Sequence, residues 1–302
     1  MAQLKADYPL KLGLLLVTST WFLFTFYQFV KSALYGATVD WPFWMLLTDN
    51  ASVVGLGFRT LGSLMAVIAV LFYVFNRDLS KPEAYMTIRW ILVAETIYWL
   101  GLFLSGVWGI FPTSNDFVSD ILGWLFVIET GIPCLLESVV IPAVLVKLFF
   151  ALNPNKPAKD AIKWGLISGS AFVFVFWLDN TANWIAAIIE KGTEYVTAYP
   201  VNSFSFILTC VGLLLLTLYT VSFALKSIGT ENLRELDLRK VGIIVVCLGL
   251  YFDVIYIMWL LFGSVGGWGT WYAWILGHNM NLWVLSLPLA GLPLLFHRKP
   301  AN

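Results

Sequence analysis

The chain has 302 residues, of which 60% are hydrophobic and only 12% are charged, and its mean hydropathy is +0.82. Soluble domains carry about 25% charged residues, so the composition excludes an ordinary soluble protein and predicts a polytopic membrane protein. Lysine plus arginine and aspartate plus glutamate both number 18, so no basic excess indicates a nucleic-acid partner. The expected surroundings are a lipid bilayer.

Eight apolar runs are long enough to cross about 30 Å of hydrocarbon as helices. In chain order they are Leu10–Leu34, Val53–Phe75, Met86–Phe111, Ile121–Phe150, Ala161–Ile189, Ser203–Leu225, Val241–Phe262 and Trp271–Phe296. The first follows Lys5 and Lys11 as in a signal peptide, but no small-x-small cleavage site comes after it, so we expect an uncleaved span. The predicted fold class is an all-α multi-pass membrane protein with eight transmembrane helices and no soluble domain.

The connections between these runs alternate in charge. Of the 18 basic residues, 15 lie in or beside five segments: the N-terminus, residues 76–85, residues 151–160, residues 226–240 and the C-terminal residues 297–302. Basic loops stay on the cytoplasmic side of a membrane. The sequence therefore predicts that both termini are cytoplasmic, which agrees with an even number of spans.

Short motifs recur at a distance of about half the chain. K-L-G-L at Lys11 matches K-W-G-L at Lys163, and E-T-I-Y at Glu95 matches D-V-I-Y at Asp253. The stretch from Trp124 to Pro142 likewise resembles that from Trp274 to Pro293. Four spans in each half would give the halves the same orientation, so we expect two parallel four-helix units, residues 1–152 and 153–302, with a pseudo-twofold axis along the membrane normal.

Ionisable residues inside apolar spans are the best guide to function. A charge at mid-bilayer costs at least about 2.5 kcal/mol on insertion scales, so it normally faces the interior of a bundle. Glu129 and Glu137 are eight residues apart with Pro133 between them, which places them on roughly one helical face beside a backbone carbonyl that the proline frees. This pattern indicates a polar pathway.

Four further groups of polar residues accompany that pair. Glu95 and Asp253 each precede a tyrosine by three residues, so acid and phenol share a helical face and could carry a proton or meet a cation. Asp179 and Asn183 are four residues apart, and His278 and Asn281 are three apart, so the members of each pair share a helical face. The alternative for each group is a structural clamp between helices.

Arg59 is the one basic residue expected within the bilayer. It either pairs with one of the buried acids or extends its side chain to the outer surface. Because F-R-T-L-G-S lies inside an apolar run, we expect the pairing.

Several cofactor chemistries lack the residues that they need. The chain has two histidines, and His297 is close to the C-terminus, which excludes bis-histidine haem ligation inside the bundle. No serine-hydrolase, zinc-protease or Walker motif is present. The three cysteines, Cys134, Cys210 and Cys247, are expected to be packing residues. The cofactor remains unknown, and a metal held by His278 with Glu129 or Asp253 remains an open alternative.

The favoured function is a proton- or cation-linked transporter or ion-conducting protein with a polar cavity toward the outer face. Its expected site residues are Glu95, Glu129, Glu137, Asp179, Asn183, Asp253, His278 and Asn281, with Arg59 as the charge partner. One alternative is a quinone-reactive membrane subunit of a redox complex, which would need a partner that carries metal centres. Another is an intramembrane enzyme acting on a lipid, with Glu129 or Asp179 as general base and His278 as acid. Homo-oligomers and partner subunits are both compatible with the sequence.

Overall fold

The computed structural model describes residues 2–38, 43–75, 88–100, 132–153, 155–197, 200–231, 235–262 and 282–296. Within these ranges the chain is helical and contains no strand. Four of the described helices are long and apolar enough to cross a membrane: Lys11–Lys31, Gly55–Phe75, Ala158–Lys191 and Asn202–Ser227. The all-helical membrane fold expected from the sequence is therefore confirmed in this coarser form.

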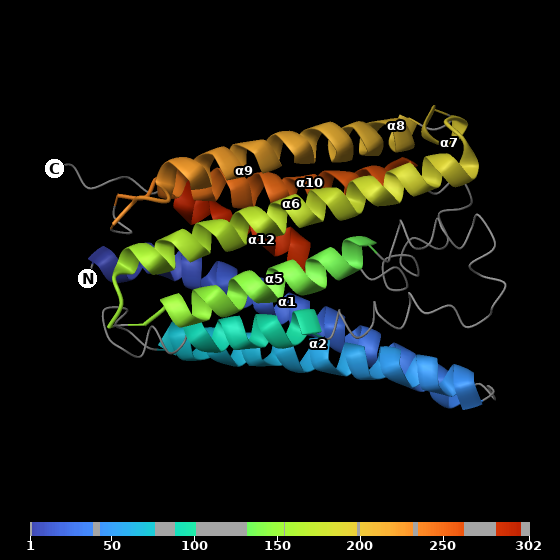
Figure 1. Ribbon diagram of the computed structural model, residues 1–302, viewed down its shortest axis with the longest axis horizontal. Helices are drawn as coiled ribbons and strands as arrows, with labels where there is room; N and C mark the ends of the chain where they lie inside the picture. Colours follow the sequence, from blue (N-terminus) through green and yellow to red (C-terminus); the bar gives the residue numbers. More distant parts are fainter. Residues whose placement is uncertain are drawn as a thin grey trace.

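The helices lie side by side along one long axis (Figure 1). Their bounds are α1 Ala2–Thr38, α2 Phe43–Phe75, an unlabelled helix at 88–100, α5 Ile132–Ala151, α6 Ala158–Lys191, α7 Glu194–Thr197, α8 Pro200–Ile207, η2 Leu208–Leu213, α9 Leu214–Ser227, α10 Leu238–Phe262 and α12 Leu282–Leu295. The start of α1 and the end of α12 lie at the same end of the bundle, together with the α5–α6 and α9–α10 connections (Figure 1). We call this the basic end, because Lys156, Lys159, Lys163, Arg239 and Lys240 lie there.

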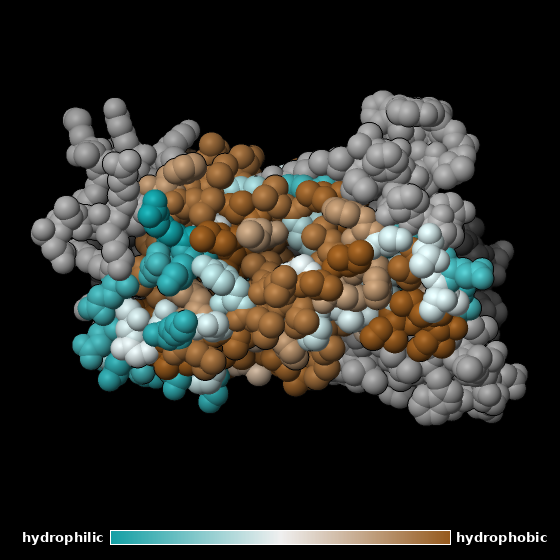
Figure 2. All heavy atoms as spheres, turned by 90° about the horizontal axis from the view of Figure 1, so that it is seen from above, coloured by the Kyte–Doolittle hydropathy of each residue, from teal (hydrophilic) through white to brown (hydrophobic). Residues whose placement is uncertain are grey.

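The outer surface between the two ends is apolar. Figure 2 shows a broad hydrophobic belt with hydrophilic residues gathered toward the ends. Large side chains in this belt are strongly exposed, among them Phe72 at 65%, Leu215 at 61% and Leu225 at 68%. An apolar surface of this extent would promote aggregation in water, whereas in hydrocarbon it needs no partner. The belt is the surface expected to face lipid acyl chains.

Glycines bring α12 into backbone contact with α10 on one side and α1 on the other. A Cβ atom at Gly249 would lie 2.5 Å from Pro288 Cδ, and one at Gly242 would lie 2.7 Å from the Leu295 backbone nitrogen. On the other side, a Cβ atom at Gly13 would lie 2.7 Å from Ala290 Cα. Small residues permit this approach, which is the usual way in which helices associate in lipid. Helix α12 thus joins the N-terminal and C-terminal parts of the chain.

A hydroxyl pair and a glycine hold α2 between its two neighbours. Thr25 of α1 and Ser63 of α2 form a buried hydrogen bond of 2.6 Å. On its other side, a Cβ atom at Gly62 would lie 2.5 Å from the Ala94 carbonyl oxygen in the 88–100 helix. Hydroxyl groups in an apolar helix stabilise the packing of helices when they form hydrogen bonds to a neighbouring helix. These contacts fix the depth of Arg59, which lies one turn before Ser63.

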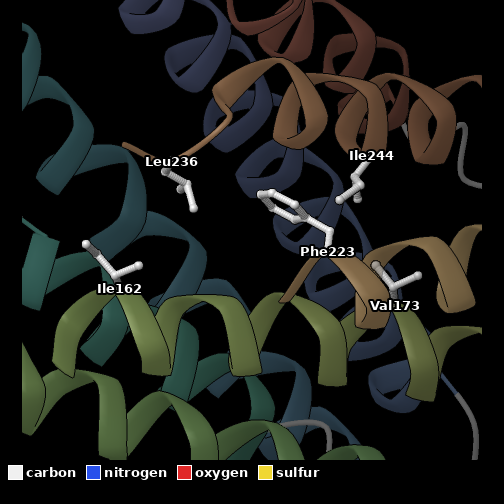
Figure 3. Close-up of a cluster of buried hydrophobic side chains, with 5 residues drawn as sticks. All are labelled: Ile162, Val173, Phe223, Leu236 and Ile244. Carbon is white, nitrogen blue, oxygen red and sulfur yellow. The ribbon is translucent and has the colours of Figure 1, made fainter. Parts of the chain in front are cut away.

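Helix α6 packs between α5 and α9. Its buried Ile162 and Val173 form a core cluster with Phe223 of α9, Ile244 of α10 and Leu236 (Figure 3). Trp99 joins the 88–100 helix to the same region, because it packs with Ile141 and Val175 and its ring lies 6.2 Å from that of Phe172. Phe172 packs against both clusters, so the hydrophobic core continues from the 88–100 helix and α5 across α6 to α9 and α10.

Candidate functional site

The clearest departure from regular helix is η2, a π-helical segment between α8 and α9. Helices of this kind are rare and are often found at functional sites. Asn202, Ser205 and Thr209 precede or open it at helical spacing, and all three are buried, with 3%, 1% and 1% of their surface exposed. One buried face of α8 and η2 is consequently polar, although the surrounding sequence is almost wholly apolar.

Thr209 connects this polar face to α10. Its Oγ1 lies 2.8 Å from the hydroxyl oxygen of Tyr251, and the bond between them is buried. Tyr251 also contacts α6, because its ring lies edge-on to that of Phe176, with centroids 5.9 Å apart, and Asp179 follows Phe176 by three residues. We call Asp179, Asn202, Ser205, Thr209 and Tyr251 the polar seam. The Thr209–Tyr251 bond joins η2 to α10, whereas Asn202 donates from Nδ2 to the Tyr195 carbonyl oxygen at 2.7 Å, and the buried Oγ of Ser205 has no hydrogen-bond partner among the described residues.

Helix α6 supports the seam with its own polar groups. Asp179 and Asn183 are both partly buried, and Asn180 donates from Nδ2 to the Phe176 carbonyl oxygen at 2.8 Å. Trp177 donates from Nε1 to the carbonyl oxygen of Cys210, within η2, at 3.4 Å. A π turn disrupts the usual backbone pairing of a helix, so a carbonyl there is open to a side-chain donor. The Trp177 bond therefore links η2 to α6, whereas the Asn180 bond stays within α6.

Asp253 lies on a different face of α10 from Tyr251. It follows Gly249 by four residues and therefore shares the face that Gly242 and Gly249 present to α12. Its Oδ1 atom is buried and has no hydrogen-bond partner among the described residues. An acceptor without a donor is costly in a buried apolar setting, which makes Asp253 the most distinctive carboxylate of the described helices.

Arg59 meets an aromatic ring. Its guanidinium carbon lies 5.6 Å from the centroid of the Tyr98 ring, and Trp21 contacts the same ring edge-on at 4.5 Å. Glu95, partly buried, precedes Tyr98 by three residues on the 88–100 helix. No ion pair joins Arg59 to a carboxylate among the described residues, so within them its charge is accommodated by a cation–π contact. Pairing of Arg59 with an acid remains a prediction.

The other predicted site residues are only partly covered. Glu129, His278 and Asn281 lie outside the described residues. Glu137 lies in α5, which in the described part of the chain begins at Ile132, but the direction of its side chain is not described. The shared face of Glu129 and Glu137, and the convergence of Glu129, Asp253 and His278, therefore stay predictions. The described residues contain no group of three histidine, cysteine or acidic side chains that could hold a metal.

The cysteines differ in part from expectation. Cys210 is partly buried and Cys247 is exposed, and both are free thiols. Cys247 therefore does not pack in the interior, which is compatible with a thiol behaving as a small apolar group against lipid. Cys134 lies in α5 without a described side-chain environment.

Sequence reasoning missed the hydroxyl-bearing members of the polar seam. It weighed ionisable groups and amides within the spans and passed over Ser205, Thr209 and Tyr251. A signal was present, because residues 202, 205 and 209 repeat at intervals of three and four, the spacing of one helical face. The pairing with Tyr251 had no such signal, since the two residues are 42 positions apart.

Thr209→Val is expected to lower the free energy of unfolding by about 0.5–1.5 kcal/mol, because it removes a buried hydrogen bond and keeps the shape of the side chain. A double-mutant cycle with Tyr251→Phe, measured by thermal unfolding in detergent, should show coupling between the two positions. Thr220→Val provides the matched control, because that hydroxyl bonds to the Leu216 carbonyl of its own helix at 2.7 Å. Equal coupling of Tyr251→Phe to both threonine variants would contradict the bond.

The described site groups hydroxyl, amide and carboxylate oxygens on α6, α8, η2 and α10, and one buried hydrogen bond, between Thr209 and Tyr251, joins two of its members. Oxygen atoms of this kind can bind a cation or exchange a proton. Comparison of the chain with protein-family models, with characterised proteins and with solved structures finds no match.

Proposed function

We propose that this protein is a membrane transporter or ion-conducting protein whose substrate, or coupling ion, is a proton or a cation. The observation that carries the proposal is the polar seam, whose members are buried except for the partly buried Asp179. Its side chains offer oxygen atoms and one carboxylate, and they include no lysine or arginine. Oxygen ligands replace the hydration shell of a cation, and a buried carboxylate favours positive over negative ions.

Asp253 offers a second carboxylate on the face of α10 that is turned away from Tyr251 and toward α12. It faces α12 from one turn beyond the Gly249–Pro288 contact. His278 and Asn281 directly precede α12 in the sequence, and α12 begins at Leu282. We propose that Asp253, Glu129 and His278 face one polar space, with Glu95, Glu137, Asp179, Asn183 and Asn281 along the same route. Shared hydrogen bonds would reduce the cost of burying several ionisable groups.

The proposed architecture is eight spans in two parallel four-helix units. The neighbours of the described helices support it. Helix α1, the first of its proposed unit, lies between α2 and α12, and helix α6, the first of the second unit, lies between α9 and α5. A twofold axis that exchanges the first four spans with the last four would produce this pattern, because it carries span two onto span six and span eight onto span four.

Both termini are proposed to be cytoplasmic. The support is that α1 begins and α12 ends at the basic end of the bundle (Figure 1), and basic residues stay on the cytoplasmic side. A reporter enzyme fused after Asn302 should be active on the cytoplasmic side only. Activity on the outer face would reject the orientation.

The function itself is tested by reconstitution. The purified protein in liposomes that contain a pH-sensitive dye should collapse an imposed proton gradient, or take up a monovalent cation, faster than empty liposomes. The experiment uses this chain alone, because a transporter needs no redox partner. Absence of flux, together with co-purification of a subunit that carries metal centres, would reject transport in favour of the quinone-reactive alternative.

A further inference from the structure

A cavity of about 460 Å³ lies between α5, α6, α9 and α10, next to Ile88 of the 88–100 helix and Leu287 of α12. Its wall is apolar and includes the cluster of Ile162, Val173, Phe223, Leu236 and Ile244, whose side chains point toward a common space (Figure 3). The hydroxyls on its lining are those of Ser170 and Thr220, and the latter is bonded within its own helix. The volume is in the range of ligand pockets, about 300–1,000 Å³.

The local sequence does not by itself explain the cavity, because a matching motif elsewhere in the chain is closely packed. Gly13 and Gly165 occupy the same position in K-L-G-L and K-W-G-L. Gly13 is closed by α12, where a Cβ atom would lie 2.7 Å from Ala290 Cα, whereas a Cβ atom at Gly165 or Gly169 would meet nothing within 4 Å. These two glycines therefore leave one face of α6 open, whereas the corresponding face of α1 is covered by α12. Interiors are normally filled to high density, so space of this size calls for an occupant.

The depth of the cavity matches one leaflet of a bilayer. Its α6 lining runs from Ala161 near the basic end to Val173, which is about 18 Å at 1.5 Å per residue. Half of the hydrocarbon thickness of a bilayer is about 15 Å. A single acyl chain that enters from the basic end would fill the cavity and end close to the middle of the membrane.

Positive charge surrounds the entrance. Lys240 lies with its Nζ 5.9 Å from the ring centroid of Phe223, a wall residue, and Lys163 follows the wall residue Ile162. Asp237 pairs with Lys240 at 3.5 Å, so Lys240 alone does not give the entrance its charge. Among the described residues of this end the cations outnumber the carboxylates. The cations are Lys5, Lys11, Arg89, Lys147, Lys156, Lys159, Lys163, Lys226, Arg239 and Lys240, and the carboxylates are Asp7, Asp160, Glu231, Glu235 and Asp237.

We infer that this cavity is a binding site for an anionic phospholipid. One acyl chain lies along Gly165 and Gly169 of α6, and the phosphate-bearing headgroup lies at the basic end near Lys163 and Lys240. The apolar wall selects the chain, and the lysines select the charge of the headgroup. The inference does not depend on the proposed transport function, because it rests on residues outside the polar seam.

The experiment measures lipid retention. The full-length protein is delipidated in detergent, mixed with equal amounts of phosphatidylglycerol and phosphatidylcholine of the same chain length, and examined by native mass spectrometry. The wild type should retain one phosphatidylglycerol with a preference of about tenfold over phosphatidylcholine. Gly165→Leu places a side chain into the cavity from a position where its Cβ atom meets nothing within 4 Å, so it should lose retention of both lipids. Leu218→Phe adds bulk on the exposed surface of α9 and should retain lipid as the wild type does.

The double variant Lys163→Gln/Lys240→Gln separates headgroup from chain. It should still retain a lipid but lose the preference for phosphatidylglycerol, because only the charge at the entrance is changed. Thermal unfolding of each variant without lipid shows whether it is folded, and Gly169→Leu repeats the test if Gly165→Leu does not fold. Any one of three results would overturn the inference. They are equal retention of both lipids by the wild type, retention that Gly165→Leu does not reduce, and displacement of phospholipid by an added uncharged quinone.

Discussion

Asp253→Asn is expected to abolish proton or cation flux in reconstituted liposomes and to leave the protein folded. Asparagine keeps the size of the side chain and one acceptor oxygen, but it removes the titratable proton and the negative charge. Asp253 is the residue to change, because its buried Oδ1 has no hydrogen-bond partner among the described residues and an amide there breaks no bond that the structure shows. A pathway that needs the carboxylate should lose at least about 100-fold in rate, the scale of a proton-transfer group.

The same measurement separates a working carboxylate from a structural one. If Asp253 only clamps α10 to a neighbouring helix, asparagine clamps as well and flux stays near that of the wild type. Glu194→Gln is the control, because Glu194 lies exposed at the start of α7, outside the apolar belt, and should leave flux unchanged. Glu129→Gln is expected to behave as Asp253→Asn does, because both carboxylates are proposed to face one polar space.

Gly249→Leu is expected to give the largest loss of stability among simple substitutions in the described helices. A Cβ atom there would lie 2.5 Å from Cδ and 2.7 Å from Cγ of Pro288, and 2.9 Å from its nitrogen. A proline ring cannot rotate away, so α10 and α12 must separate. Overpacking a well-fitted contact typically costs about 1–3 kcal/mol, and we expect the upper end or beyond, because α12 also joins α1 through Gly13.

Size-exclusion chromatography and thermal unfolding in detergent measure this loss. Gly169→Ala is the matched control, because a Cβ atom on that part of α6 would meet nothing within 4 Å. That variant should unfold at the wild-type temperature or slightly above it, since alanine favours helix over glycine by up to about 1 kcal/mol. If both variants unfold at the same temperature, close approach at Gly249 does not hold α12 in place.

The helical membrane fold can be predicted from the hydropathy of the chain alone. Hydropathy acts on each segment separately, because a long apolar stretch in lipid must satisfy its own backbone hydrogen bonds and does so as a helix. The same holds for the concentration of basic residues at one end, which depends on the connections and not on packing. Arg59 within a span was likewise predictable, because its depth follows from the length of apolar chain on either side.

Which polar groups meet depends instead on how the helices pack. Thr209 and Tyr251 form their bond across 42 residues of chain, and Arg59 lies against the ring of Tyr98 rather than a described carboxylate. The glycines of K-L-G-L and K-W-G-L show the reason most directly, since one is closed by α12 and the other faces an open cavity. A local sequence pattern determines which face of a helix carries small or polar side chains. The neighbour on that face depends on how all the helices pack, because lipid and protein offer an apolar helix similar surroundings.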